Sequence, residues 1–255
     1  MIKRIIQQLT PGFLFDLYKK KKYRKILESH EIKSQTDLII AKKLVNQESS
    51  FIDIGANIGL YTKYLAPFSK ETLSFEPVPF TYSVLKENIK YFNLRNVKAY
   101  CIAISDQVGE TQIEIPIQSG VYNYYRASLE ATENPGYKTH RVATETIDSL
   151  FGESVRKISL VKCDVEGHEL SVIKGADKFL KTKDAPWLIE ISENPDTEGS
   201  TANILFGIMS EHKFKPYYFD GEKLYQRKFG DESINYFFLK EMHRNNLADE
   251  GIKFD

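Results

Sequence analysis

Residues 51–61 read FIDIGANIGLY, and this stretch decides how the rest of the chain folds. Phe51 to Ile54 have the apolar character of a buried strand, and small or turn-forming residues follow at positions 55, 56, 57 and 59. Apolar and aromatic side chains then recur at helical spacing from Leu60 to Leu65. A strand, a tight glycine turn and a helix in this order predict the entry to a βαβ unit.

The turn lacks the two common phosphate-binding motifs. Position 57 is Asn and position 60 is Leu, so the dinucleotide fingerprint G-x-G-x-x-G is absent, and so is the phosphate loop G-x-x-x-x-G-K-[ST]. Instead, Asp53 precedes the turn, and Glu76 ends the next apolar run about 20 residues further on, where such folds place a carboxylate on ribose hydroxyls. A carboxylate at the turn suits an ammonium or sulfonium group better than a pyrophosphate. The pattern therefore favours S-adenosylmethionine as ligand, and an ordinary βα turn with surface acids is the alternative.

Composition limits the class of protein. The chain has 255 residues, 42% of them hydrophobic, which fits one α/β domain with additions. Lys and Arg number 35, as do Asp and Glu, so no net charge attracts nucleic acid. Cys101 and Cys163 end apolar runs and are predicted to be buried free thiols, which favours a cytoplasmic location. We expect no membrane span and no signal peptide.

We divide the chain into a helical extension at 1–35, a domain at 36–245 and a polar tail at 246–255. The extension is interrupted at Thr10-Pro11-Gly12 and carries a basic run from Lys19 to Lys25. One interpretation is contact with a membrane surface or another polyanion. The favoured one is a solvated helix whose apolar side packs on the core or on a second subunit, as in a homodimer.

Five apolar runs within the domain predict the core strands, at 51–54, 71–75, 97–101, 158–163 and 187–191. Two more strands are expected near 214–219 and 234–239. Helical patterns lie between them, at 36–47, 58–66, 80–93, 147–151, 169–180 and 201–211. Ligands of such sheets bind at the carboxyl ends of the strands, so an adenine is expected near Cys101 to Ser105, with Ala103 and Ile104 among its contacts.

A second chemical stretch, Asp164-Val165-Glu166-Gly167-His168-Glu169, follows the fourth core strand. Asp164 and Glu166 should face opposite ways if the strand continues regularly. Either acid suits a base near the methyl donor or an acceptor for the donor's ammonium group. His168 is the natural candidate for a base near neutral pH, and a histidine exposed at a helix start is the alternative.

Two further groups are candidate substrate contacts. The long aperiodic segment 116–140 contains an aromatic cluster with one arginine, which suits a sugar or, equally, a dimer interface: Tyr122, Tyr124, Tyr125 and Arg126. Glu190 lies within the apolar fifth strand, where an acid is costly unless it is paired or catalytic, and Glu193 and Asn194 follow in the next loop. With Asp164 these loop residues offer oxygens to a divalent ion, but their spacing does not specify a site and we predict no metal.

Several blocks together resemble the FkbM-type family of SAM-dependent methyltransferases: IDIGANIGLYT, FEP at 75–77, AISD at 103–106, ETIDSL at 145–150 and KCDVEGHE at 162–169. The resemblance covers about residues 35–240. It implies an α/β class I (Rossmann-like) fold, with a seven-stranded, mostly parallel sheet, an antiparallel last strand and helices on both faces.

The resemblance also implies site residues. Asp53, Gly55, Asn57 and Gly59 would line the methionine end of S-adenosylmethionine, Glu76 would bind the ribose, and Asp164 to His168 would lie beside the reacting centre. Ala56, Tyr61 and Pro77 complete the expected cofactor contacts. Cys101 stands where relatives often have a polar residue near the adenine.

The activity that follows is methyl transfer to a hydroxyl of a sugar, glycan or secondary metabolite, with Asp164, Glu166 or His168 as the base. A nucleic-acid methyltransferase is the first alternative, but its [ND]-P-P-[YF] block is replaced here by DVEG. A non-catalytic glycan-binding module of the same fold is the second alternative.

Overall fold

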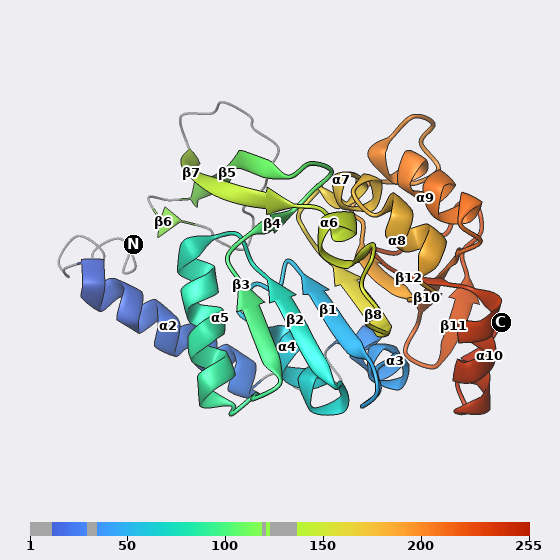
Figure 1. Ribbon diagram of the computed structural model, residues 1–255, viewed down its shortest axis with the longest axis horizontal. Helices are drawn as coiled ribbons and strands as arrows, with labels where there is room; N and C mark the ends of the chain where they lie inside the picture. The colour runs from blue at the N-terminus through green and yellow to red at the C-terminus, as the bar shows by residue number, and fades with distance from the viewer. Residues whose placement is uncertain (1–11, 30–34, 119–120, 123–136) are drawn as a thin grey trace.

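The computed structural model describes residues 12–29, 35–118, 121–122 and 137–255. Among these residues nine strands form one sheet, in the order β13-β11-β10-β12-β9-β8-β1-β2-β3 (Figure 1). The strands are β1 Ser50–Ile54, β2 Glu71–Phe75, β3 Val97–Tyr100, β8 Ile158–Cys163, β9 Trp187–Glu190, β10 Lys215–Phe219, β11 Lys223–Gln226, β12 Asn235–Leu239 and β13 Lys253–Phe254.

The sheet confirms the predicted fold class. Strands β3, β2, β1, β8 and β9 are parallel, β12 is antiparallel to β9, and β10 pairs with β12. The number of strands is larger than the seven expected, because β11 and β13 extend one edge. The expected polar tail at 246–255 instead ends α10 (Glu241–Asp249) and forms β13, and Leu247 is buried.

Helices cover both faces of the sheet because successive side chains of each strand point to opposite sides. One face, with Ile52, Val161 and Trp187, packs on α6 (Ile147–Phe151), α7 (Glu169–Lys174), α8 (Asp177–Thr182) and α9 (Thr201–Glu211). The other face, with Phe51 and Leu160, packs on α3 (Asp37–Leu44), α4 (Leu60–Leu65) and α10. Each large side chain buried in these layers contributes roughly 1.5–3 kcal/mol.

The predicted helix at 169–180 is two helices, because the chain turns at Gly175 and Ala176 between α7 and α8. A Cβ on Gly175 would lie 2.1 Å from the backbone oxygen of Ser105, so only glycine permits this approach. The contact joins the end of α7 to the segment after β4, at the edge of the sheet where the site lies.

A second sheet stands beyond the carboxyl ends of β1 to β3 (Figure 1). Its order is β4-β7-β5-β6, with β4 Ala103–Ile104, β5 Gly109–Gln118, β6 Val121–Tyr122 and β7 Tyr137–Glu145. Residues 111–115 belong to β5 and residues 142–145 to β7, and the apolar side chains Ile113, Ile115 and Val142 are buried together. This small sheet forms a wall over the end of the large one.

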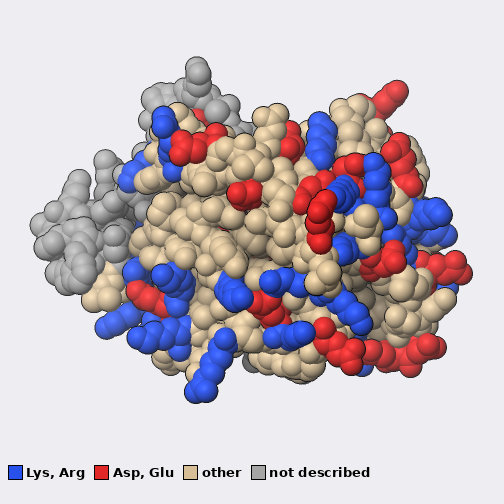
Figure 2. Space-filling view, in the orientation of Figure 1, with Lys and Arg blue, Asp and Glu red and all other residues tan. Residues whose placement is uncertain are grey.

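The basic helix α2 (Gly12–Ser29) lies against α5 (Pro79–Tyr91) in Figure 1. Leu27 is buried beside Val84, and Lys20 Nζ lies 2.8 Å from Glu87 Oε1. Lys21, Lys22 and Lys25 are exposed, and Figure 2 shows Lys and Arg gathered over this corner. Packing on the core, the favoured interpretation, agrees with these contacts. Contact with a membrane surface or a second subunit stays a prediction, and in the described ranges no helix combines the length and apolar character needed to cross a bilayer.

Candidate active site

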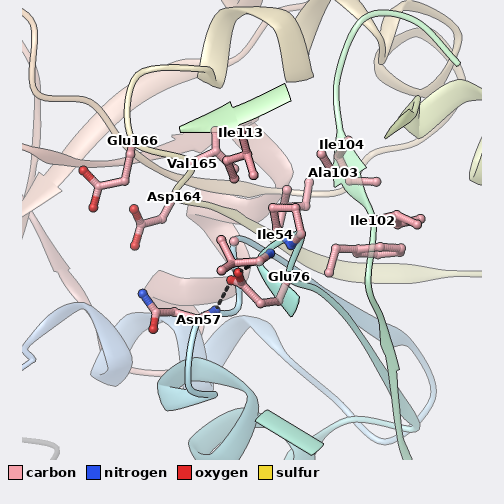
Figure 3. A pocket seen from close by; sticks show the side chains of 14 residues that line it. Ile54, Asn57, Glu76, Ile102, Ala103, Ile104, Ile113, Asp164, Val165 and Glu166 are labelled. Atoms are coloured by element: carbon pink, nitrogen blue, oxygen red, sulfur yellow. Dashed lines mark hydrogen bonds between the residues drawn. The ribbon is translucent and has the colours of Figure 1, made fainter. Parts of the chain in front are cut away.

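A cavity with about 600 Å³ of open space lies at the carboxyl ends of β1, β2 and β8 (Figure 3). It is lined by Ile54, Gly55, Asn57, Phe75, Glu76, Pro77, Val78, Ile102, Ala103, Ile104, Ile113, Asp164, Val165 and Glu166. Among these, eight residues had been predicted as site residues: Gly55, Asn57, Glu76, Pro77, Ala103, Ile104, Asp164 and Glu166.

The glycine turn forms the floor of the cavity. Gly55 has φ +73°, and a Cβ at this position would lie 1.8 Å from the backbone oxygen of Asp164. The amides of Gly55 and Ala56 donate to the carbonyl oxygen of Phe75, at 3.0 and 2.9 Å. Gly59 precedes α4 with φ +95°. The turn therefore brings β1 directly against the ends of its neighbours β2 and β8.

Glu76 presents a buried carboxylate in the middle of the cavity. Its side chain is 5% exposed, and its two oxygens accept from the amides of Asn57 and Val78, each at 2.9 Å (Figure 3). Burial raises the pKa of Glu76 to about 7, although the two amide bonds lower it. A carboxylate has about four acceptor positions, and these amides occupy two of them. Glu76 is thus able to accept from further donors, such as two neighbouring hydroxyls.

An apolar wall faces Glu76 across the cavity. Ile102, Ala103 and Ile104 form one side of it, and Ile113 of β5 closes it from the second sheet (Figure 3). Ile113 and Val78 were not predicted as site residues. The sequence around Ile113 alternates apolar and polar residues, which is typical of a strand, but nothing in this pattern indicates that the strand folds over the end of the large sheet.

Acidic side chains form the opposite end of the cavity (Figure 3). Asp164 and Glu166 both line it, contrary to the expectation that they face opposite ways. That expectation was wrong, because residues two apart in the sequence point to the same side of a strand. Beyond β8, which ends at Cys163, Glu166 takes φ +53° in the turn that follows. Glu169 Oε1 holds this turn by accepting from the amides of Val165 and Gly167, at 3.2 and 3.1 Å.

Four predicted cofactor residues do not line the cavity: Asp53, Ala56, Gly59 and Tyr61. Asp53 is 1% exposed, and its Oδ2 accepts from Thr62 Oγ1 at 2.6 Å. Strand alternation explains this placement, because Ile54 faces the cavity and Asp53 points to the opposite face of β1. The predicted contacts of these four residues with the cofactor stay predictions. Tyr61 is also buried there, and its hydroxyl accepts from Gln35 Nε2 at 3.0 Å.

His168 lies behind the turn, outside the residues that line the cavity. Its Nε2 is 2.9 Å from Ser105 Oγ, and burial lowers the pKa of the imidazole although Asp106 raises it. The ring therefore joins the start of α7 to the end of β4. Its predicted role as a base stays a prediction.

The predicted substrate residues lie in three places. Glu190 ends β9 beside β8, and burial and the Asp164 carboxylate raise its pKa to about 7. Glu193 caps α9 by accepting from Thr201 Oγ1 at 2.6 Å, and Asn194 Oδ1 accepts from the amide of Asp196 at 2.9 Å, so both stabilise their own loop. Tyr122 belongs to β6, but its side chain is outside the description, as are Tyr124, Tyr125 and Arg126 entirely.

Free cysteines and metal ligands complete the inventory of reactive groups. Cys163 is buried and Cys101 partly buried, both as free thiols, as predicted. In the described part of the chain, no group of three or more His, Cys, Asp or Glu side chains is arranged to hold a metal ion.

Comparison with known proteins identifies relatives of this arrangement. Methyltransferase 1 of Beauveria bassiana is 26% identical over 147 residues, which cover 51% of this chain and 59% of that protein. The hexuronic acid methyltransferase AglP of Haloferax volcanii is 28% identical over 163 residues, 60% of either chain. This chain thus spans about 60% of the length of these curated relatives.

A solved structure of methyltransferase FkbM from Methylobacillus flagellatus has a TM-score of 0.48 at 14% identity, covering 76% of this chain and 44% of that one. The profile of the methyltransferase FkbM domain matches residues 53–216, more than half of the sequence, and includes the glycine turn, Glu76 and the turn after β8. The chain belongs to the FkbM methyltransferase family.

Proposed function

We propose that this protein transfers a methyl group from S-adenosylmethionine to a hydroxyl of a sugar, a glycan or a secondary metabolite. The observation that carries the proposal is the buried carboxylate of Glu76, set between an apolar wall and an acidic end of one cavity. The carboxylate suits the ribose of the cofactor, the apolar wall suits its adenine, and the acidic end suits its amino-acid ammonium group.

The residues present fit this cofactor. Glu76 retains acceptor positions for the two ribose hydroxyls. The side chains of Phe75 and Ile102 to Ile104 offer an apolar surface for the adenine. Asp164 offers a carboxylate for the ammonium group. When bound, S-adenosylmethionine supplies an electrophilic methyl group on a sulfonium sulfur.

Proton removal from the acceptor hydroxyl falls to one of three titratable side chains around Asp164. Glu166 lines the mouth of the cavity, and Glu190 has a pKa of about 7, which suits a base working near neutral pH. His168 remains the third candidate, with its Nε2 already 2.9 Å from Ser105 Oγ. Single replacements by Gln or Asn should lower kcat for the true base while leaving cofactor affinity nearly unchanged.

The acceptor class rests on two supports. The relative from Haloferax volcanii is named a hexuronic acid methyltransferase, which favours a sugar acceptor here. The balanced charge of 35 basic and 35 acidic residues offers no general attraction to nucleic acid.

Calorimetric titration with S-adenosylhomocysteine tests the cofactor, with Glu76→Gln as the decisive variant. We expect binding to the wild type and a loss of roughly 10- to 150-fold in the variant, the effect of removing hydrogen bonds to a charged group. Glu153→Gln, an exposed Glu paired with Lys178, is the matched control and should bind normally. Labelled S-adenosylmethionine with a panel of sugars and polyketide alcohols then identifies the acceptor. Absence of binding to the wild type would overturn the proposal.

A further inference from the structure

Lys162 is a buried lysine directly beneath the acidic end of the cavity. It is the residue of β8 two positions before Asp164, and it is 3% exposed. Its side chain shares the face of Asp53, its register partner on β1. A lysine in such a place is unfavourable unless charged partners surround it. None of the roles assigned so far to the site explains its presence.

The partners of Lys162 link the interior to the cavity. Its Nζ lies 2.7 Å from Asp164 Oδ2 and 4.8 Å from the centre of the Tyr61 ring. Burial alone would lower the pKa of Lys162, but the carboxylates of Asp164 and Asp53 outweigh burial and raise it. The raised pKa favours the charged ammonium form of Lys162, and Asp164 is the partner that it contacts directly.

The inward side of this cluster has no second hydrogen-bond donor for Asp53. Asp53 Oδ1 is fully buried and has no hydrogen-bond partner among the described residues, while Oδ2 is bonded to Thr62. The charge of Lys162 thus compensates Asp53 at a distance while its hydrogen bond is directed to Asp164. The direct ion pair of Lys162 is thus made with the acid that lines the cavity and not with the more deeply buried Asp53.

We propose that Lys162 is a positioning residue, which fixes the Asp164 carboxylate in the orientation that receives the ammonium group of the methyl donor. This inference rests on the proposed function. Asp164 lines the cavity with 30% of its side chain exposed, so a carboxylate held at Oδ2 keeps its other oxygen for a ligand. Preorganising an ionic group in this way avoids the loss of side-chain freedom on binding.

Two ligands distinguish positioning from a general structural role. S-adenosylhomocysteine carries the amino-acid ammonium group, whereas 5′-methylthioadenosine has the same adenosine and thioether without it. Calorimetry with both ligands should show that Lys162→Met weakens S-adenosylhomocysteine roughly tenfold or more, as expected for a charged hydrogen bond. The affinity for 5′-methylthioadenosine should change less than about twofold. Asp164→Asn should weaken the binding of the two ligands in the same way as Lys162→Met. The double variant should lose no more affinity for S-adenosylhomocysteine than either single variant does.

Controls keep the test decisive. Lys178→Met removes an exposed lysine paired with Glu153 and should alter neither affinity. Lys162→Arg retains the charge but replaces the compact amine by a bulkier planar group, so it should weaken S-adenosylhomocysteine less than Lys162→Met. It replaces Lys162→Met if circular dichroism shows the latter to be unfolded. Equal weakening of both ligands, unchanged affinity for S-adenosylhomocysteine, or additive single losses would overturn the positioning role. Failure of the wild type to bind either ligand would overturn the proposed function, and the inference with it.

Discussion

Replacing Gly55 by Ala tests the close contact on which the site is built. The residue has φ +73°, and a Cβ would lie 1.8 Å from the backbone oxygen of Asp164, far inside van der Waals contact. That oxygen belongs to the chain just after β8, so it moves only if the strand end moves with it. The substitution therefore combines a conformational cost with a steric one.

Gly199 separates the two costs. Its φ is +76°, almost that of Gly55, but a Cβ there would meet nothing within 4 Å. Gly199→Ala should cost only the left-handed conformation, about 1–2 kcal/mol. Gly55→Ala should cost this amount plus about 1–3 kcal/mol for overpacking. The difference between the two variants, about 1–3 kcal/mol, is the contribution of the contact with Asp164.

Urea unfolding followed by circular dichroism measures both free energies, and calorimetry with S-adenosylhomocysteine measures the site. Gly55→Ala should have the lower unfolding free energy and, because Asp164 is displaced, the weaker binding. In thermal melts the gap corresponds to roughly 2–12 °C for a domain of this size. Equal destabilisation of the two variants, with binding intact, would refute the close approach of β1 to the end of β8.

Three other results follow from the same structure. Glu76 binds protons more tightly when folded, since its pKa is raised from 4.5 to about 7, so stability should fall as pH rises from 5 to 8. Urea unfolding at several pH values measures this fall, and the wild type should lose about 3 kcal/mol more than Glu76→Gln. An equal loss in the wild type and the variant would contradict the raised pKa of Glu76. Leu27→Ala, at a buried position of α2, should lower the unfolding free energy by about 2–5 kcal/mol. Ile26→Ala, at a neighbouring position that is 40% exposed, should change it by less than about 0.5 kcal/mol. Similar values for the two variants would mean that α2 does not pack against α5. A double-mutant cycle between Ser105→Ala and His168→Ala should give a coupling of about 1 kcal/mol in unfolding experiments, and no coupling would show that the 2.9 Å contact is absent.

The fold was predictable because its signals are local. Apolar runs bounded by turn residues located the core strands, and the glycines at 55 and 59 marked the one turn at which the chain takes φ values of +73° and +95°. Glu76 followed from the same logic, since a residue that directly ends a strand lies at the ligand-binding edge. In contrast, residues 246–255 looked polar, and their pairing with β11 depends on distant partners rather than on their own pattern.

The differences between the expected and the observed positions of side chains at the site concern the face of the sheet on which each side chain lies. Asp53 precedes the turn by two residues and was assigned to the cofactor, but it points to the face opposite Ile54 and binds Thr62. Glu166 was expected to face away from Asp164, but residues two apart share a face of a strand, and both side chains line the cavity. The turn in which Glu166 takes φ +53° follows the end of β8 at Cys163. Lys162 lies still inside the strand, so it shares the inner face with Asp53 and reaches Asp164 from below. The ion pair between Lys162 and Asp164 joins the core to the cavity because β8 ends between the two residues. Predicting this pair therefore requires the end of the strand as well as the identity of the two residues.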